Sequence, residues 1–255
     1  MMTRQIHRHE IPRKVLHVSI GFFSIYLYTS GVQPPTLTPI LFTALIPIAS
    51  VDFLRHRFPS LNRTYVRVLG ALMRESEVDG WNGVVWYLLG AYIALRCFPK
   101  DIGMMSVLLL SWCDTAASTV GRAYGRYTPR VRKGKSLAGS LAAFVVGVGA
   151  AAAFWGWLVP RTGPLPGDDI NPFMFNGVLR LPYTAMRLLG WASPGDDTTS
   201  TAGSISGGLA LGVMSLWTGL MGAVSEVVDL AGCDDNLTIP VLSAVGLWGF
   251  LKVFT

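Results

Sequence analysis

The chain has 255 residues, of which 51% are hydrophobic and 14% are charged, whereas soluble domains carry about 25% charged residues. With a mean hydropathy of +0.45, this composition excludes an ordinary soluble protein, and several apolar runs approach the roughly 20 residues that cross a bilayer. The formal net charge of +6 does not indicate nucleic-acid binding, because the positive charge lies in short loops between apolar runs, as in membrane proteins.

The apolar runs predict an all-α fold, a polytopic membrane helical bundle of about seven transmembrane helices in a single domain, residues 1–255. The first 14 residues lack the apolar core of a signal peptide. The three cysteines, at unrelated spacings, indicate neither a disulfide framework nor a zinc site. The predicted spans are Val15–Tyr28, Thr36–Leu54, Gly83–Phe98, Ile102–Gly121, Ser136–Trp157, Ser204–Val228 and Leu237–Phe254.

The first span begins with a small polar cluster. Arg13 and His17 lie one helical turn apart, with Lys14 beside Arg13. Arg13 and Lys14 either anchor the helix at the lipid headgroups or reach a functional site. His17 lies deeper in the span, where a histidine is either a packing residue or a ligand.

The second span and the polar loop after it carry acidic residues. Asp52, near the end of that span, is either functional or paired with Arg55 or Arg57. In the loop, an amphipathic helix is predicted over Leu61–Met73. The acids around Glu77 then either position a metal ion or an attacking hydroxyl, or belong to a solvated turn.

The stretch Ser111–Ser140 combines features that suit a polyphosphate at a membrane surface. Asp114 lies inside an apolar run and is a candidate Mg²⁺ ligand. Gly121 and Gly125 follow on the same helical face, so that a ligand can approach the backbone. Six cationic residues then come within fourteen positions, namely Arg122, Arg126, Arg130, Arg132, Lys133 and Lys135.

A phosphate-binding helix start is predicted at Ser136. Gly134-Lys135-Ser136 looks like the end of a P-loop, but the first glycine of that motif would fall on Pro129, so the pattern fails. Ser136 still begins a helix, whose free N–H groups attract phosphate, and Lys135 adds a point charge. Gly139 lets the backbone come near. The alternative for this stretch is a plain helix–loop–helix with positive-inside charges.

Residues 159–203 form an irregular, proline-rich insertion. Its piece Phe173–Trp191 is apolar with sparse arginines, which predicts an interfacial or re-entrant helix rather than a span.

The orientation follows from the lysine and arginine count. The N-terminal segment and the 55–82 and 122–135 loops hold 15 of the 21 lysines and arginines, and are therefore predicted to lie in the cytosol. With seven spans, the Asp114 end, Glu77, Lys135 and the Asp234-Asp235 loop meet at one cytosolic face.

Four stretches together resemble the CTP-using lipid enzymes, which include phosphatidate cytidylyltransferases and the polyprenol, phytol and dolichol kinases. The most similar family is the fungal CTP-dependent diacylglycerol kinases, and the resemblance covers nearly the whole chain except 159–203. The stretches are Arg13-Lys14-x-x-His17, Leu72-Met73-Arg74-x-x-Glu77-x-x-x-x-Asn82-Gly83, Asp114-x-x-Ala117-x-x-x-Gly121-Arg122-x-x-Gly125-Arg126 with Lys133-Gly134-Lys135-Ser136-x-x-Gly139-Ser140, and Asp234-Asp235-Asn236-Leu237-Thr238-Ile239-Pro240.

The resemblance implies a multi-pass enzyme of the endoplasmic reticulum and nuclear membrane that transfers the γ-phosphate of CTP to diacylglycerol, giving phosphatidate and CDP. It implies a divalent cation, Mg²⁺ or Ca²⁺, and it matches Arg13, Lys14, Asp114 and Gly121 to active-site positions.

Other functions stay open at this point. Cytidylyltransferases end with a Lys-Arg…Lys-Asp and Asp-Arg pattern, and here the corresponding region, Glu226-x-x-Asp229…Asp234-Asp235-Asn236, has no such basic residues. That difference favours a kinase over CDP-diacylglycerol synthase, although the core motif does not exclude a dolichol or polyprenol kinase. A transporter is a more remote alternative, which inverted repeats would favour, and the sequence contains none.

The expected roles follow from the needs of phosphoryl transfer, which are positioning and charge neutralisation. Asp114 and Asp234 are the candidate metal ligands, and Asp114, Lys135, Glu77 and Asp235 the candidate catalytic residues. Glu77, Asp234 or Asp235 accepts the hydroxyl proton or binds a second metal, and Asn236 is alternatively a helix N-cap. The expected nucleotide- and phosphate-binding residues are Arg13, Lys14, His17, Gly121, Arg122, Gly125, Arg126, Lys133, Gly134, Ser136, Gly139 and Asn236.

Overall fold

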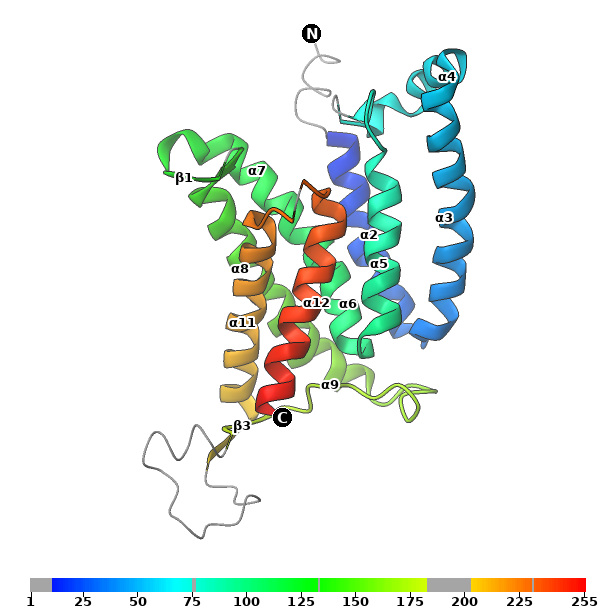
Figure 1. Ribbon diagram of the computed structural model, residues 1–255. Helices are drawn as coiled ribbons and strands as arrows, with labels where there is room; N and C mark the ends of the chain where they lie inside the picture. The colour runs from blue at the N-terminus through cyan, green and yellow to red at the C-terminus, as the bar shows by residue number, and fades with distance from the viewer. Residues whose placement is uncertain (1–10, 75–76, 133, 183–202, 231) are drawn as a thin grey trace.

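The computed structural model describes residues 11–74, 77–132, 134–182, 203–230 and 232–255. This part of the chain is mostly helical, and its longer helices run roughly alongside one another in a bundle (Figure 1). The helices are α2 (Ile11–Thr29), α3 (Pro34–Arg57), α4 (Pro59–Leu69), α5 (Gly83–Cys97), α6 (Lys100–Leu108), α7 (Asp114–Tyr124), α8 (Leu137–Ala153), α9 (Val159–Thr162), α11 (Gly207–Val227) and α12 (Asp235–Phe254).

Short elements join or extend these helices. Two π-helical turns continue α6 into α7 and α8 into α9, and two antiparallel strand pairs, β1 with β2 and β3 with β4, close loops at the bundle ends. They are η1 (Gly70–Leu72), η3 (Leu109–Cys113), η4 (Gly125–Tyr127), η5 (Phe154–Leu158), β1 (Arg130–Arg132), β2 (Lys135–Ser136), β3 (Val178–Arg180) and β4 (Ser204–Ser206).

The predicted spans correspond to helices, with corrected boundaries. The sixth begins at Gly207 rather than Ser204, because Ser204–Ser206 is a strand paired with Val178–Arg180. The amphipathic helix begins earlier than predicted, at Pro59, where proline suits the first helical turn. The span predicted over Ile102–Gly121 is a helical run with a π-turn inside it.

Fewer helices than predicted have the length and apolar character of a span. Among the described residues, four do: Pro34–Arg57, Leu137–Thr162, Gly207–Val227 and Asp235–Phe254. The number of about seven is therefore not confirmed. α5 is apolar but shorter, and the π-turn and the polar α7 divide the run that contains Asp114.

The helix α3 stands at the edge of the bundle (Figure 1). Its buried residues lie near its two ends, at Pro34 and Thr38 and at Asp52 and Arg55. Between them it exposes large apolar side chains such as Ile46. An exposed apolar middle suits contact with lipid chains, which are as apolar as leucine.

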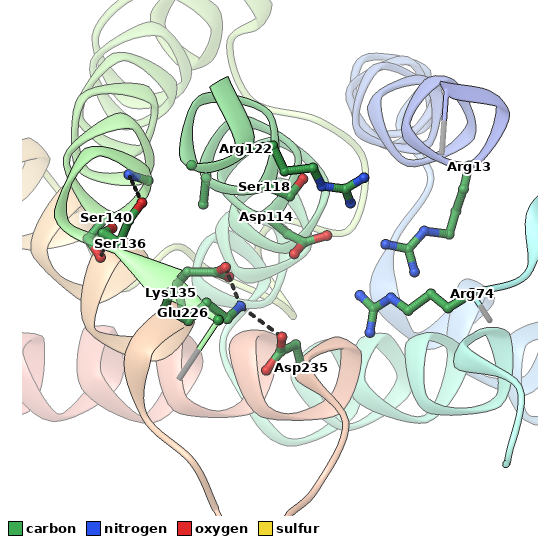
Figure 2. Close-up of a pocket in the computed structure, with 14 residues that line it drawn as sticks. Arg13, Arg74, Asp114, Ser118, Arg122, Lys135, Ser136, Ser140, Glu226 and Asp235 are labelled. Atoms are coloured by element: carbon green, nitrogen blue, oxygen red, sulfur yellow. Dashed lines mark hydrogen bonds and ion pairs between the residues drawn. The ribbon is translucent and has the colours of Figure 1, made fainter. Parts of the chain in front are cut away.

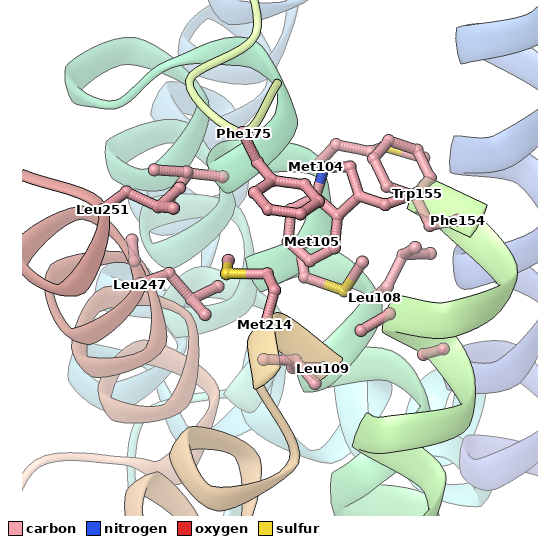
Figure 3. Close-up of a cluster of buried hydrophobic side chains, with 14 of the residues drawn as sticks. Met104, Met105, Leu108, Leu109, Phe154, Trp155, Phe175, Met214, Leu247 and Leu251 are labelled. Atoms are coloured by element: carbon pink, nitrogen blue, oxygen red, sulfur yellow. The ribbon is translucent and has the colours of Figure 1, made fainter. Parts of the chain in front are cut away.

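The hydrophobic core surrounds α6, all of whose residues are buried. Because α6 continues through the π-turn into α7, this packing also fixes the position of Asp114. Figure 3 shows the centre of the core, with side chains from α6, the two π-turns, α11, α12 and the 163–177 loop, namely Met104, Met105, Leu108, Leu109, Phe154, Trp155, Phe175, Met214, Leu247 and Leu251.

The described part of the 159–203 insertion is tied to the start of α6. The carboxylate of Asp101 accepts hydrogen bonds from the backbone N–H groups of Met174, at 3.1 Å, and Phe175, at 3.0 Å. Lys100 Nζ donates to Asp168 Oδ1 at 2.5 Å, and this ion pair lowers the pKa of Asp168 against the opposing effect of burial. The loop is therefore held to the bundle by buried charges.

The helix predicted over Phe173–Trp191 is wrong for residues 173–182, which contain the strand Val178–Arg180 and no helix. The backbone N–H groups there bond to Asp101 and to β4 instead of to a preceding turn. Residues 183–191 of that prediction lie outside the described residues.

Helices α8 and α11 pack closely because glycine lines their contact. A Cβ atom added at Gly219 would lie 2.6 Å from the carbonyl oxygen of Phe144 and 2.5 Å from a methyl group of Val148. Small residues that let helix backbones approach are typical of membrane helix packing. Gly212, two turns earlier on α11, has no atom within 4 Å of the same position.

These two glycines make a matched test. We expect Gly219→Ala to lower the free energy of unfolding by about 1–3 kcal/mol, because the methyl group forces α8 and α11 apart. Gly212→Ala should be neutral or stabilising by up to about 1 kcal/mol, since alanine favours helix. Thermal unfolding of the detergent-solubilised protein measures both, and equal melting temperatures for the two variants would contradict the packing described.

Candidate active site

A polar cavity of about 230 Å³ lies where the ends of α2, α7, α8, α11 and α12 meet the 73–82 loop. Its charged lining residues are Arg13, Arg74, Asp114, Arg122, Lys135, Glu226 and Asp235. Small residues complete the wall, namely Ala117, Ser118, Gly121, Gly134, Ser136, Gly139 and Ser140. The structure thus brings together predicted site residues from segments that are far apart in the sequence.

Asp114 occupies the middle of this arrangement. Its carboxylate points into the cavity, and the side chains of Arg13, Arg74 and Arg122 extend toward the same space (Figure 2). Asp114 Oδ2 lies 3.8 Å from His17 Nδ1, and both side chains are almost fully buried. The π-turn η3 ends at the residue before Asp114, and such turns are frequent at functional sites.

Lys135 lies on the other side of the cavity and is neutralised by two acids. Its ammonium group donates to Glu226 Oε1 and, at 2.8 Å, to Asp235 Oδ2. Burial alone would lower the pKa of Lys135, but the two carboxylates raise it. The sequence predicts that Lys135 adds a point charge for phosphate, and in the structure its ammonium group is already paired with two carboxylates.

The predicted helix start at Ser136 is confirmed. Ser136 is the N-cap of α8, and its Oγ accepts a hydrogen bond from the Gly139 backbone N–H at 3.3 Å. A Cβ atom at Gly139 would lie 2.8 Å from the carbonyl oxygen of Ala117, so glycine allows α7 and α8 to meet there. Gly134 precedes the strand residue Lys135 with φ of +82°, a conformation that favours glycine.

Two predicted phosphate ligands lie in a neighbouring hollow rather than in this cavity. Gly125 and Arg126 line a polar hollow of about 470 Å³, together with Thr128 and Arg130. The hollow shares Gly121, Gly134, Lys135 and Ser136 with the cavity, so the two spaces adjoin. The Arg126 guanidinium also donates to the hydroxyl of Tyr127.

Other predicted residues have partners outside the cavity. Lys14 Nζ donates to Thr119 Oγ1 at 2.9 Å, which ties α2 to α7. Asn236 is buried and donates to the carbonyl oxygen of Gly83 at 3.2 Å. The alternative role of Asn236 as a helix N-cap is wrong, because the N-cap of α12 is Asp234, whose Oδ1 accepts a hydrogen bond from the Asn236 N–H. Lys133 lies outside the described residues.

Asp234 and Glu77 do not line the cavity themselves, but each pairs with one of the arginines that do. Asp234 Oδ2 is 3.6 Å from Arg74 Nη1, and Glu77 Oε1 is 3.7 Å from Arg13 Nη1. Burial raises the pKa of both acids. Glu77 Oε1 is buried and has no hydrogen-bond partner among the described residues.

Sequence reasoning missed several lining residues. Arg74 was part of the recognised motif, but no role was predicted for it. Burial alone would lower its pKa, yet Asp114, Asp234 and Glu77 hold the pKa above its ordinary value. Glu226 entered the sequence analysis only in the comparison with cytidylyltransferases, and its position near the end of the predicted span Ser204–Val228 was the available signal. Ser118 and Ser140 carried no signal beyond their small size.

Comparison with known proteins gives one consistent result. A protein of Schizosaccharomyces pombe named CTP-dependent diacylglycerol kinase 1 is 43% identical over 241 residues, which are 94% of this chain and 93% of the relative. Two further relatives carry the same name. The one from Saccharomyces cerevisiae is 41% identical over 98% of this chain and 76% of the relative. The one from Eremothecium gossypii is 43% identical over 94% of this chain and 67% of the relative. The chain belongs to the CTP-dependent diacylglycerol kinase family. No family model matches the sequence, and no solved structure matches the chain.

In this member of the kinase family, a buried ion pair holds the loop that carries Glu77. Asp52 pairs with Arg55 at 2.6 Å, and neither side chain is exposed. This confirms the interpretation of Asp52 as paired and identifies Arg55, not Arg57, as its partner. The other Asp52 oxygen, Oδ2, accepts from the Asn82 N–H at 3.0 Å.

Every N–H group of the Arg55 guanidinium donates a hydrogen bond. Beyond Asp52, its guanidinium donates to Asn62 Oδ1 at 2.9 Å and to three backbone carbonyl oxygens of the loop. Those acceptors are Glu77 at 2.9 Å, Val78 at 3.0 Å and Gly80 at 2.6 Å. Because guanidinium has five N–H donors in a fixed plane, Arg55 fixes the course of the loop and not merely its distance from α3.

Removing this side chain should be costly. Arg55→Ala leaves Asp52 buried without its cation and the loop carbonyls without their donor, so the free energy of unfolding should fall by about 3–5 kcal/mol. Arg57→Ala, an exposed arginine two residues on, should change it by less than about 0.5 kcal/mol. Denaturation in detergent compares the two, and a similar small loss for both would show that the pair is not a structural centre.

Proposed function

We propose that this chain is a lipid kinase that transfers the γ-phosphate of CTP to diacylglycerol, producing phosphatidate and CDP. The observation that carries the proposal is the arginine-lined cavity around Asp114, in a chain 41–43% identical to relatives named CTP-dependent diacylglycerol kinase. The relatives' name does not favour a dolichol or polyprenol kinase or CDP-diacylglycerol synthase. A transporter is likewise not favoured, since these relatives are named as kinases.

The cavity suits the triphosphate because three arginines line it, while Glu226 and Asp235 are paired with Lys135 and leave Asp114 as its remaining acid. Arg13, Arg74 and Arg122 line it, and planar guanidinium groups bind phosphate oxygens in pairs. The N-terminus of α8 adds free N–H groups at Ser136. The adjoining hollow at Gly125 and Arg126 leaves room for the nucleoside part of the nucleotide.

A divalent cation, Mg²⁺ or Ca²⁺, fits the acids of the cavity. Mg²⁺ usually takes one or two carboxylates together with phosphate oxygens, and Asp114 would hold it, with the buried Glu226 nearby. Such an ion supplies neutralisation of the phosphate charge. Asp234 is a less suitable ligand than predicted, because it pairs with Arg74 and caps α12. No group of three or more His, Cys, Asp or Glu side chains suited to an ion occurs in the described ranges.

Glu77 is the acid best suited to receive the hydroxyl proton of diacylglycerol. Asp235 is bound to Lys135, and Asp234 both pairs with Arg74 and caps α12. Glu77 also lies 3.7 Å from a cation, Arg13, but among the described residues its buried Oε1 accepts no hydrogen bond. In the reaction the lipid oxygen forms a bond to the γ-phosphorus, the bond from that phosphorus to the bridging oxygen breaks, CDP leaves, and the proton moves to Glu77. A base whose pKa is raised by burial accepts that proton more readily.

The membrane arrangement is part of the proposal. We assign about seven spans, formed by α2, α3, α5, α6 with α7, α8 with α9, α11 and α12. The lysine and arginine count supports a cytosolic N-terminus and a cytosolic active site. The resemblance to the fungal kinases supports a place in the endoplasmic reticulum and nuclear membranes.

The reaction is tested with labelled nucleotide. Purified protein in mixed micelles should transfer label from the γ-position of CTP to diacylglycerol, with ATP a poor substitute. A control with CTP labelled at the α-phosphate should leave the lipid unlabelled. Label passing from the α-phosphate into lipid, with release of pyrophosphate, would instead show a cytidylyltransferase.

In the same assay, Asp114→Asn tests the centre of the cavity. The amide keeps the volume but loses the charge, so turnover per folded molecule should fall by at least about 10²-fold. The protein should stay folded, since a neutral amide costs less than a carboxylate in a bilayer. Near-normal turnover in a protein of lowered melting temperature would assign Asp114 a structural role.

A further inference from the structure

A second, apolar hollow lies close to the active-site cavity. It has a volume of about 380 Å³, within the roughly 300–1,000 Å³ of ligand sites. It is bounded by α3, α4 and α5 at the α4 end of the bundle (Figure 1). Its wall includes Ile48, Val51, Leu69, Leu72, Val84 and, as a polar group, Asn82.

Two of the helices that line this hollow, α3 and α5, contribute exposed apolar side chains to it. Val51 and Val84, on its α3 and α5 sides, are each 41% exposed. Exposed apolar side chains gathered around a hollow mark an interaction site in a soluble protein. On the outer surface of a membrane bundle, the molecules that reach such a hollow are lipids.

The hollow is joined to the active-site cavity by one loop. Met73 lines the hollow, and the next residue, Arg74, lines the cavity. Glu77 lines neither space but is adjacent to both. Its Oε1 would be 2.8 Å from a Cβ atom at Gly83, the residue between Asn82 and Val84 of the hollow, and it is 3.7 Å from Arg13 of the cavity.

We infer that this hollow binds the acyl part of diacylglycerol and brings its free hydroxyl to Glu77, beside the nucleotide's γ-phosphate. The inference rests on the proposed function. A substrate with long apolar chains and a single reactive hydroxyl needs an apolar site open to the bilayer and next to the phosphate cavity. Among the described residues this hollow meets both conditions, and no cationic side chain lines it.

The test fills the hollow without touching the cavity. Val84→Trp should raise the apparent KM for diacylglycerol by about tenfold or more while changing the KM for CTP by less than about twofold, because only lipid binding is obstructed. Val51→Trp approaches the same space from α3 and serves if Val84→Trp does not fold. Val213→Trp is the matched control, since Val213 on α11 is 40% exposed, against 41% for Val84, and lines neither space.

Photolabelling identifies the occupant directly. A diacylglycerol with a diazirine in one acyl chain should label peptides from residues 47–51 or 65–84, and unlabelled diacylglycerol should compete. Unchanged KM values in both tryptophan variants, or equal labelling by a diazirine phosphatidylcholine that diacylglycerol does not displace, would overturn the inference in favour of an ordinary bilayer lipid. Failure of the proposed function looks different, because the wild-type protein would then transfer no phosphate from CTP to lipid.

Discussion

A carboxylate inside an apolar helix is costly unless other elements bring compensating groups to it, and the site depends on how this chain compensates Asp114. His17 of α2 lies 3.8 Å from it, and arginines from α2, the 73–82 loop and α7 share its cavity. These elements are distant in sequence and meet only through the packing of the bundle. The apolar core around α6 therefore supports the chemistry, because it fixes the helix from which Asp114 projects.

The candidate site also requires α7 and α8 to approach each other closely. The Oγ of Ser136 would lie 3.3 Å from a Cβ atom at Gly121 and 2.7 Å from one at Gly125, so the start of α8 rests against the glycine face of α7. Larger side chains at those positions would separate the helix N-terminus from Asp114. The spacing of small residues after Asp114 thus has a direct geometric meaning in this chain.

The sequence predicted the parts of the site that local chemistry determines. Asp114 was recognisable because an acid in an apolar run is unusual, and Ser136 because Gly134-Lys135-Ser136 leads into an apolar helix whose start attracts phosphate. The sequence could not show that Lys135 would be neutralised by Glu226 and Asp235, roughly 90 to 100 residues away. Pairings of that kind depend on the order of helices in the bundle, which hydropathy does not encode. The same limit applied to Arg74, and to Phe173–Trp191, where bonds to Asp101 oppose a helix.

The hydrogen bonds of Arg55 couple two segments that are separate in the chain, the end of α3 and the loop that carries Glu77. Its guanidinium joins the last turns of α3 to the carbonyl groups of the loop bearing Glu77. Opening either part alone would leave the buried arginine without some of its hydrogen-bond acceptors. In native-state hydrogen exchange, the end of α3 and this loop are therefore expected to open as a single cooperative unit. The edge helix, whose exposed middle is apolar, is thereby expected to share one local stability with the loop that carries the proposed proton acceptor Glu77.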